Sequence, residues 1–280
     1  MISVVIPAYD EELVIGRCLT SLLDGIEDPG QLDVVVVCNG CSDRTADVAA
    51  AFGPPVRVLE MPVSSKPQAL NRGDTVAKGF PRFYVDADVE LSARALLEVA
   101  AVLESGQALA AAPRLEVDLE DRSWRIRAYY QVWCQLQYVG DDLIGSGVYA
   151  LSELGRRRFD RFPAIIADDL FVRNLFGPGE RVSLETCSFT VRPPRTLSAL
   201  VRNKSRARAG DMQYHRLYGN GSDSRPDTSP ALRRLARQPV LWPDLALYVA
   251  VSAATRARAM WKVRRGDLAD WERDDTARQS

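Results

Sequence analysis

Short runs of β-branched residues alternate with helix-like segments through the first third of the chain, and this alternation constrains the fold more than any other feature. The apolar runs cover residues 2–7, 32–37, 56–60 and 82–85. Helical patterns follow each run, at residues 12–23, 43–52, 66–79 and 92–105. Four strand–helix alternations in about 105 residues predict an α/β domain with a parallel sheet.

The second half of the chain is less regular. The predicted elements there are two strands and two helices, at residues 108–117, 181–191, 124–138 and 170–176. Residues 219–230 are rich in Gly, Ser, Asp and Pro, which is typical of a linker or loop. We therefore predict a main domain over residues 1–218 and a C-terminal helical extension over residues 231–280.

Charge is balanced over the chain as a whole. The 280 residues include 36 Lys and Arg against 37 Asp and Glu, for a net charge of -1. This balance argues against binding through overall basic charge, so we expect no nucleic-acid partner. Residues 202–216 are locally basic, with Asp211 as the one acid. That stretch fits either an anionic ligand or a solvated helix face.

The five cysteines are scattered, which is typical of reduced thiols in a cytoplasmic protein. Cys38 and Cys41 form a C-x-x-C, but the chain has no second ligand pair to complete a zinc site. The first residues predict a strand rather than a secretory signal. No apolar stretch reaches the roughly 20 residues of a membrane-spanning helix. We therefore expect a cytoplasmic protein.

Two carboxylates bracket one small residue directly after the fourth predicted strand, in Asp86-Ala87-Asp88. Such hard oxygen ligands suit Mg²⁺ or Mn²⁺ carrying a diphosphate. A second acid pair, Asp168-Asp169, precedes the predicted helix at 170–176. Each pair also has a purely structural interpretation: the first would be acids of a turn at the end of a strand, and the second would be an N-cap of the following helix.

Polar residues follow the ends of three predicted strands, at 9–11, 39–43 and 86–88. In open α/β sheets, ligands bind beyond the carboxyl ends of the strands. We therefore expect these three segments to converge on one crevice.

Five stretches of the chain together resemble the family 2 glycosyltransferases. They are residues 5–11 (VIPAYDE), 39–45 (NGCSDRT), 66–73 (KPQALNRG), 84–88 (YVDAD) and 167–169 (ADD), in the family's order. The resemblance extends over roughly residues 1–216. It implies a GT-A fold, with a mixed, mostly parallel central sheet flanked by helices. It also implies transfer of a sugar from a nucleotide-sugar donor, with inversion and with Mn²⁺ or Mg²⁺.

The same resemblance implies roles for individual residues. Asp88 is the expected direct metal ligand, with Asp86 beside it. Asp169 is the expected catalytic base, and the like charge of Asp168 would raise the pKa of its carboxyl. The donor-binding residues would be Pro7, Tyr9, Glu11, Asn39, Asp43, Lys66, Asn71, Asp86 and Ala87. An arginine-rich element of the family is matched by Arg202 and Arg206, whose guanidinium groups suit a diphosphate.

Two departures from the family's pattern limit these implications. Cys38 stands where many relatives carry an Asp that bonds uracil, so the donor base is open among UDP, GDP and dTDP. The Gln-x-x-Arg-Trp of processive synthases is also missing, so we expect transfer of a single sugar. The acceptor is open among a sugar, a lipid-linked molecule and a small molecule. The pathway would be biosynthesis of a cell-surface glycan, a glycolipid or a glycoside.

Three further features each allow two interpretations. His215 is either an ordinary surface or core residue or a third metal ligand. The aromatic residues of the predicted helix 124–138 either pack in the core or stack on a sugar acceptor. Residues 241–251 are apolar and precede a basic segment. They predict either peripheral contact with the inner face of a membrane or a helix packed on the catalytic domain.

Two alternatives to a glycosyltransferase remain. A nucleotidyltransferase on a related sheet is disfavoured, because residues 7–16 lack the Gly-rich, Arg-containing loop that such enzymes use. An inactive relative that binds nucleotides or glycans as a scaffold is disfavoured by the two intact acid pairs.

Overall fold

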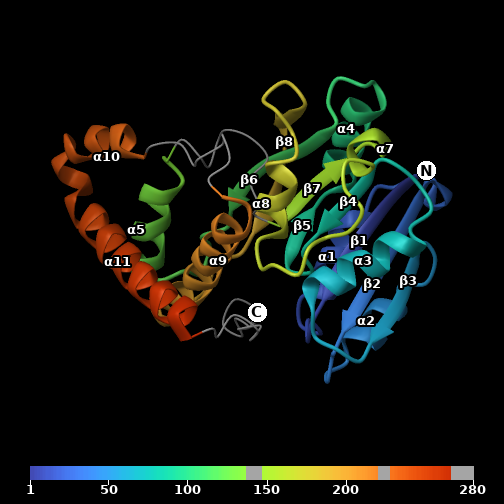
Figure 1. Cartoon of the computed structure of the whole chain (residues 1–280), viewed down its shortest axis with the longest axis horizontal. Helices are drawn as coiled ribbons and strands as arrows, with labels where there is room; N and C mark the ends of the chain where they lie inside the picture. Colours follow the sequence, from blue (N-terminus) through green and yellow to red (C-terminus); the bar gives the residue numbers. More distant parts are fainter. Residues whose placement is uncertain (137–146, 220–227, 266–280) are drawn as a thin grey trace.

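A computed structural model of the chain describes residues 1–136, 147–219 and 228–265 (Figure 1). Its described strands form one eight-stranded sheet, in the order β3-β2-β1-β4-β7-β6-β8-β5. The strands are β1 (Ile2–Ala8), β2 (Leu32–Asn39), β3 (Val56–Met61), β4 (Arg82–Val85), β5 (Val89–Leu91), β6 (Ala110–Val117), β7 (Val148–Leu151) and β8 (Arg181–Val191).

The sheet is mixed, as predicted. Strands β3, β2, β1 and β4 are parallel neighbours, and β6 pairs with β8 in parallel. Strand β7 is antiparallel to both β4 and β6, and β5 is antiparallel to β8. Strands β1 and β2 are buried along their whole length and are mostly apolar, as expected for strands covered on both sheet faces. Strands β5 and β7 were not predicted, because three or four residues carry too little periodicity.

Three helices cover the two faces of the parallel half: α1 (Ile15–Leu23), α2 (Thr45–Ala50) and α3 (Lys66–Val76). A fourth, α4 (Ala93–Glu104), lies beside α1 and over β6, β7 and β8. Val4 and Ile6 of β1 pack with α1, α2 and α4, whereas Val5 packs with Leu70 of α3. Successive side chains of a strand point to opposite faces, so α3 lies alone among these four on its face. Helix α3 ends at Val76, three residues before its predicted end, and the backbone of the next residue, Ala77, is extended. Arg82 of β4 donates hydrogen bonds to the carbonyls of Ala77 and Gly79 just after the helix.

The remaining helices are α5 (Trp124–Trp133), α7 (Glu153–Arg156), α8 (Asp168–Arg173), α9 (Leu197–Tyr218), α10 (Ser229–Ala236) and α11 (Trp242–Arg265). Two short 3₁₀ turns, η1 (Pro29–Gln31) and η2 (Pro239–Leu241), complete the described elements. Figure 1 shows α5, α10 and α11 gathered at the end of the molecule away from β2 and β3. None of the described helices combines the length and hydropathy of a membrane span.

Helix α5 uses its aromatic residues for packing. Tyr129, Tyr130 and Trp133 form a buried cluster with Leu200 of α9 and Val251 of α11. This placement supports core packing over sugar stacking for these three side chains. The helix ends at Trp133, earlier than predicted, and residues 137 and 138 lie outside the described residues.

Most of the predicted linker, residues 220–227, also lies outside the described part of the chain. Its last two residues, Ser229 and Pro230, belong to α10 instead. Pro fits there because the first turn of a helix does not need its missing N–H. The division into a main domain, a linker and an extension remains a prediction.

Helix α3 approaches β1 so closely that only glycine fits at one position. A Cβ on Gly73 would lie 2.4 Å from Val5 Cγ1 and 3.2 Å from Val37 Cγ2. Overpacking a filled core costs about 1–3 kcal/mol, so Gly73→Ala should lower the free energy of unfolding by about that amount. Urea unfolding of the purified chain would measure the change.

Gly16→Ala is the matched control, because the nearest atom to its Cβ, Val48 Cγ1, is 3.7 Å away. Alanine is a better helix former than glycine by about 1 kcal/mol, so this variant should be stabilised or unchanged. Equal urea midpoints for Gly73→Ala and the unaltered chain would contradict the close packing of α3 on β1.

Candidate active site

A small cavity opens where β1 and β4 reach their carboxyl ends. Its volume is about 20 Å³, and its walls include Pro7, Lys66, Asp86, Asp168 and Asp169. Asp86 of the first predicted acid pair and both acids of the second pair, which are far apart in sequence, therefore meet at one place, while Asp88 is not among the lining residues. This is the position at which an open α/β sheet binds ligands.

Lys66 joins the two acid pairs directly. Its Nζ lies 2.7 Å from Asp86 Oδ1 and 3.1 Å from Asp168 Oδ1. Burial opposes the ammonium charge, but Asp168 and Asp86 outweigh it and raise the pKa of Lys66 above its usual value. The lysine is the first residue of α3, a helix capped by Ser65, whose hydroxyl accepts a hydrogen bond from the Gln68 N–H.

Asp168 is the more deeply buried acid of the second pair, at 2% exposure. The hydroxyl of Tyr149 donates to its Oδ2 over 3.2 Å. The ring of Tyr149 stacks on Tyr84 at a centroid distance of 5.0 Å. Tyr149 was not predicted as a site residue. The one hint in the sequence was the apolar run of residues 148–151, which forms strand β7 and carries Tyr149.

Asp169 is half-buried, and its Oδ1 accepts a hydrogen bond from the N–H of Leu170 over 2.7 Å. Both acids lie in the first turn of α8, where carboxylates stabilise a helix. Burial and the charge of Asp168 raise the pKa of Asp169 to about 7, against the opposing effect of Lys66. A carboxylate with a pKa near neutral is well suited to accept a proton.

Asp86 and Asp88 lie on the turn between β4 and β5. Asp86 is half-exposed, Asp88 is exposed, and Ala87 between them is buried. The Asp86 N–H donates to the carbonyl of Gly147 over 2.8 Å. Gly147 has a φ of 112°, and a Cβ there would lie 2.7 Å from Val89 Cγ2. Two accessible carboxylates on a fixed turn match the hard-oxygen donor set of Mn²⁺ or Mg²⁺.

Helix α9 braces the segment that carries the second acid pair. Gln213 Oε1 accepts a hydrogen bond from the Ile166 N–H over 3.0 Å. A Cβ on Gly210 would lie 3.0 Å from Ile166 Cβ, so the two backbones are close. Arg206 and Arg202 precede Gly210 by one and two helical turns. Residues four apart share a helix face, so these arginines extend the row that meets the acid segment.

His215 is also on α9, in its last turn. Its Nδ1 lies 3.4 Å from the carbonyl of Gly219, and its ring packs edge-on against Tyr214. Among the interactions of the described residues, these are the contacts of His215, and neither involves Asp86 or Asp88. Its role as a metal ligand stays a prediction.

The loops after β1 and β2 are joined by hydrogen bonds of Asp43 and Asn39, two side chains predicted to contact the nucleotide. Asp43 Oδ1 accepts from the Thr45 N–H, and its Oδ2 accepts from the Glu12 N–H. Asn39 is fully buried, donates to the Ala8 carbonyl and accepts from the Ser65 N–H. These bonds hold the walls of the crevice. Contacts of Asn39 and Asp43 with a donor remain predictions.

Two other predicted residues, Tyr9 and Glu11, lie on the same loop after β1. Tyr9 is half-buried, whereas Glu11 is buried and its N–H donates to Thr45 Oγ1 over 2.7 Å. Asp10, between them, accepts from the N–H of Ser42 over 2.6 Å. The loop is therefore held against the start of α2.

Asp10, Cys41 and Asp43 bring their ligand atoms within 4.8 Å of one another. The cluster is explained by the loop hydrogen bonds, since the Cys41 sulfur accepts from the Asp10 N–H and Asp10 accepts from the Asp43 N–H. Cys38 is buried, and its hydrogen bond to Cys41 lowers the pKa of the Cys41 thiol to about 7. The C-x-x-C therefore belongs to the contact between the loops after β1 and β2.

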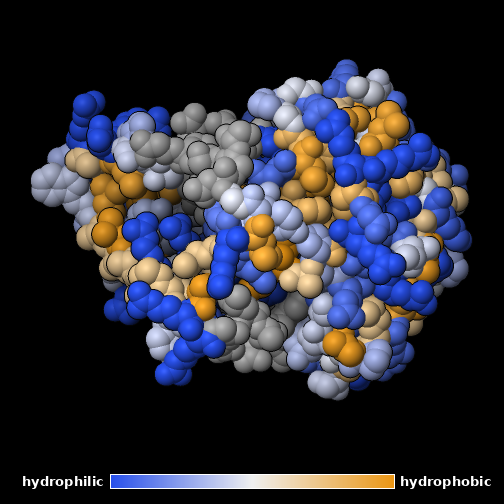
Figure 2. Space-filling model, in the orientation of Figure 1, coloured by the Kyte–Doolittle hydropathy of each residue, from blue (hydrophilic) through white to orange (hydrophobic). Residues whose placement is uncertain are grey.

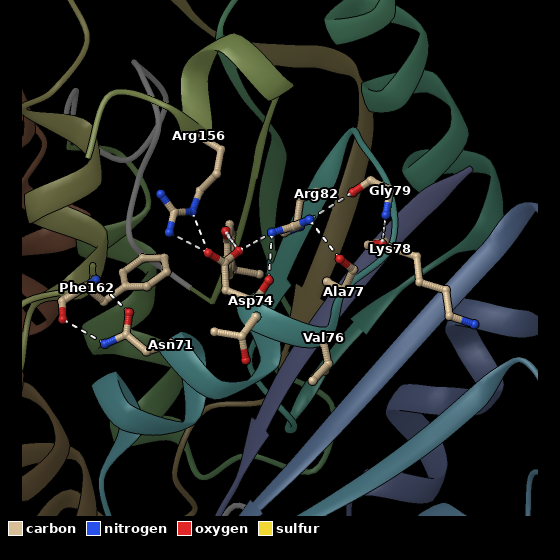
Figure 3. Close-up of polar contacts among 12 residues, drawn as sticks. Asn71, Asp74, Val76, Ala77, Lys78, Gly79, Arg82, Arg156 and Phe162 are labelled. Carbon is tan, nitrogen blue, oxygen red and sulfur yellow. Dashed lines mark hydrogen bonds and ion pairs between the residues drawn. The ribbon is translucent and has the colours of Figure 1, made fainter. Parts of the chain in front are cut away.

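Asn71 clamps the segment that leads to the second acid pair (Figure 3). Its Nδ2 donates to the Phe162 carbonyl over 3.0 Å, and its Oδ1 accepts from the Phe162 N–H over 2.8 Å. The amide thus binds both backbone groups of one residue. Its predicted contact with the donor remains a prediction, while its observed role is to position residues 159–167.

Asp74, one turn after Asn71 on α3, holds the start of the same segment indirectly, through Arg156 (Figure 3). Its carboxylate accepts hydrogen bonds from Arg156 over 2.7 Å, Arg82 over 2.5 Å and Tyr84 over 2.7 Å. Arg156 also donates to the carbonyl of Phe159. Burial alone would raise the pKa of Asp74, but these hydrogen bonds outweigh it and lower that pKa. This network was not predicted, although the three-residue spacing of Asn71 and Asp74 indicated a shared helix face.

Removing the charge of Asp74 should destabilise the protein. Asp74→Asn leaves two arginines without their buried carboxylate, which costs about 3–5 kcal/mol. Because the folded pKa of Asp74 lies below the unfolded value, its contribution is full at neutral pH and is lost as the pH falls through the folded pKa. Urea unfolding at neutral and acid pH would therefore show a defect that shrinks with acidity.

Asp24→Asn is the control, because Asp24 is exposed at the end of α1. Surface substitutions of this kind change stability by about 0.5 kcal/mol or less. A defect for Asp74→Asn no larger than that of the control would contradict the anchoring role.

The pKa of Asp169 can be measured without substrate. Carbon NMR of aspartate carboxyl groups should show one residue that titrates near pH 7, and this signal should disappear in Asp169→Asn. Asp168→Asn should move the titration to lower pH because it removes a neighbouring negative charge. Asp211→Asn should move it less, since Asp211 contributes less to the shift. Titration of Asp169 near the ordinary aspartate value of about 4 would contradict the buried pair.

Solved structures of similar shape share the architecture over nearly the whole chain. Mannosyltransferase PcManGT from Pyrobaculum calidifontis, in complex with GDP-Man and Mn²⁺, has a TM-score of 0.63 at 18% identity, covering 96% of this chain and 80% of that one. S. aureus TarS 1-349 in complex with UDP-GlcNAc has a TM-score of 0.56 at 13% identity, covering 95% and 92%. Identities this low establish the shared GT-A fold alone, which confirms the predicted fold.

A third structure is similar over a smaller part of the chain. Glucosyl-3-phosphoglycerate synthase from Mycobacterium tuberculosis, with Mn²⁺, UDP and its product, has a TM-score of 0.52 at 21% identity, covering 76% of this chain and 79% of that one.

Sequence similarity is concentrated in the first part of the chain. "Probable glycosyltransferase YdaM" of Bacillus subtilis (strain 168) is 31% identical over 94 residues, which are 31% of this chain and 22% of that protein. The profile of the family "Glycosyl transferase family 2" matches residues 3–160. These residues include Lys66, Asp86 and Asp88 but end before Asp168 and Asp169. Since the match spans more than half of the chain, the protein belongs to glycosyl transferase family 2.

Proposed function

We propose that this glycosyltransferase moves a single sugar from a nucleotide-sugar donor to an acceptor hydroxyl, with inversion and with Mn²⁺ or Mg²⁺. The observation that carries the proposal is the contact of Lys66 with both Asp86 and Asp168. It joins the candidate metal-binding turn to Asp168, the neighbour of the candidate base Asp169, through one ammonium group. Holding reacting groups in one place supplies much of the catalytic effect of an enzyme.

The donor would bind on the side of Asp86 and Asp88. A divalent cation held by these carboxylates would neutralise the departing diphosphate as the sugar is released. Lys66 adds a half-buried positive charge beside the same position, and Arg202 and Arg206 would bind the diphosphate from α9. Pro7, Tyr9, Glu11, Asn39, Asp43, Asn71 and Ala87 would form or support the donor-binding wall, and His215 would be a further metal ligand.

The acceptor would bind beside Asp169. Its carboxylate would take the proton of the attacking hydroxyl, and the pKa of about 7 makes it a stronger base than an exposed aspartate. Asp168 acts through Asp169 and is a positioning residue, held by Lys66 and Tyr149. Attack from the side opposite the departing diphosphate would invert the anomeric carbon.

Solved structures of the same fold support the choice of donor, since their ligands include GDP-Man with Mn²⁺ and UDP-GlcNAc. The base stays open among UDP, GDP and dTDP because Cys38, a buried free thiol, stands where many relatives carry an Asp that bonds uracil. A sugar, a lipid-linked molecule or a small molecule would be the acceptor, in cell-surface glycan, glycolipid or glycoside biosynthesis. The predicted place of action is the cytoplasm, near the inner face of the membrane.

Calorimetric titration with UDP, GDP and dTDP tests the donor site, each with Mn²⁺ and with EDTA. We expect binding of one nucleotide that disappears with EDTA and in Asp88→Asn. Asp169→Asn should keep this binding but transfer sugar about 10²–10⁴-fold more slowly, because it lacks the base.

Asp160→Asn is the matched control for the loss of turnover, because Asp160 is exposed on the same segment as the acid pair. It should bind and transfer as the unaltered chain does. Absence of binding by all three nucleotides with metal would contradict the donor site. Full activity of Asp169→Asn would instead overturn its role as base and leave the donor site intact.

A further inference from the structure

Helix α11 carries an exposed apolar face that runs along most of its length. We define this outer face by its exposed apolar side chains, which are Trp242, Pro243, Ala246, Val249, Ala250, Ala253, Ala254, Ala257, Met260 and Trp261. Its large members are far from buried, with exposures of 60% for Trp242, 58% for Val249 and 48% for Trp261. Arg256 is the one charged residue among the exposed side chains between Trp242 and Trp261.

The rotation of α11 about its axis is set by the opposite face. Val251, Thr255 and Ala259 are buried there. The Thr255 carbonyl accepts a hydrogen bond from Ser205 of α9, and Tyr248 stacks on Tyr129 of α5 at 5.4 Å. Helix α11 therefore packs on α9 and α5, as one of its two predicted interpretations expected. It uses one face and leaves the outer face exposed.

Positive charge lies at both ends of the outer face. Near the start of the outer face, Arg233 and Arg234 of α10 and Arg237 just after it are exposed. Near its end, Arg264 and Arg265 are exposed. Asp244 is the one acid between residues 228 and 265. Figure 2 shows this arrangement on one side of the molecule, with orange and tan surface over α11 between blue groups.

The exposed apolar surface continues past the start of α11. Val240 of η2, two residues before Trp242, is 80% exposed. Tryptophan, with an apolar ring and a polar N–H, is enriched where a membrane meets water. The outer face has one tryptophan close to each end, about 28 Å apart at 1.5 Å per residue.

We propose that the outer face of α11 lies flat on a lipid bilayer that carries anionic headgroups. The apolar side chains would enter the boundary between headgroups and acyl chains, as amphipathic interfacial helices do. The arginines at both ends would contact the headgroups, where each basic residue adds to the affinity for an anionic surface. The helix rests on the bilayer and does not cross it.

A second copy of the chain covers this face less well. In a two-fold symmetric pair with antiparallel α11 helices, Arg233, Arg234 and Arg237 of one copy would approach Arg264 and Arg265 of the other. Like charges that face each other are destabilising. An anionic bilayer meets the same arginines with opposite charge.

Flotation of the full chain with vesicles tests the proposal. We expect little binding to phosphatidylcholine vesicles and at least about tenfold more to vesicles in which one third of the lipid is phosphatidylglycerol. Added salt should reduce the binding because it screens surface charge. Equal absence from both kinds of vesicle would overturn the proposal.

Two pairs of variants separate the apolar and the charged contributions. Val249→Asp should reduce vesicle binding by about tenfold, because it places a charge in the apolar boundary. Leu97→Asp, at an exposed position of α4, is its control and should bind as before. Arg264→Gln with Arg265→Gln should weaken binding by a similar factor. Its charge-matched control is Arg94→Gln with Arg157→Gln, on α4 and next to α7.

Thermal unfolding confirms that each variant is folded. Loss of binding in the outer-face variants alone supports the proposal, and equal loss in the controls overturns it. Light scattering after gel filtration measures the molar mass and so tests whether two copies of the chain associate. A dimer that Val249→Asp converts to a monomer, with no vesicle binding by either form, would assign the face to self-association instead.

Discussion

The ammonium group of Lys66 is the interaction on which the candidate active site depends. It is half-buried and forms ion pairs with Asp86 and Asp168, so one cation joins a carboxylate after β4 to a carboxylate at the start of α8. Without it, the charge of Asp168 would be uncompensated beside Asp169. Burial and the charge of Asp168 raise the pKa of Asp169, and Lys66 limits that rise, so the position of this one lysine affects both the geometry and the charge of the site.

The parallel half of the fold was readable from the sequence because its strands are buried on both faces and its helices are amphipathic. The same holds for Asp86 and Asp88, since a carboxylate motif after a strand lies at the carboxyl edge of the sheet. Tyr149 and the Asp74 network were not readable. Their roles depend on which strand becomes the neighbour of β4, and pairing between β4 and β7 leaves no local trace in the sequence.

Residues predicted to touch the donor divide into two kinds in the structure. Lys66 and Pro7 line the cavity itself. Asn39, Asp43 and Asn71 use their polar atoms on backbone groups of neighbouring loops. The resemblance predicts that all of them belong to one site, and the structure places only Pro7 and Lys66 among them at the cavity. The sequence pattern could not separate the two kinds, since an amide that binds a loop and one that binds a ligand have the same spacing along the chain.

Helix α3 contributes Lys66 to the cavity and Asn71 and Asp74 to the segment that presents the second acid pair. Two adjoining parts of the protein are thus fastened to one short helix. Local opening of residues 159–167 requires that the hydrogen bonds of Asn71 and Arg156 to this segment break. Unwinding of α3 would remove Asn71, the Asp74 that holds Arg156, and Lys66 from their places. The site and this helix therefore form one cooperative unit, which opens or stays closed as a whole.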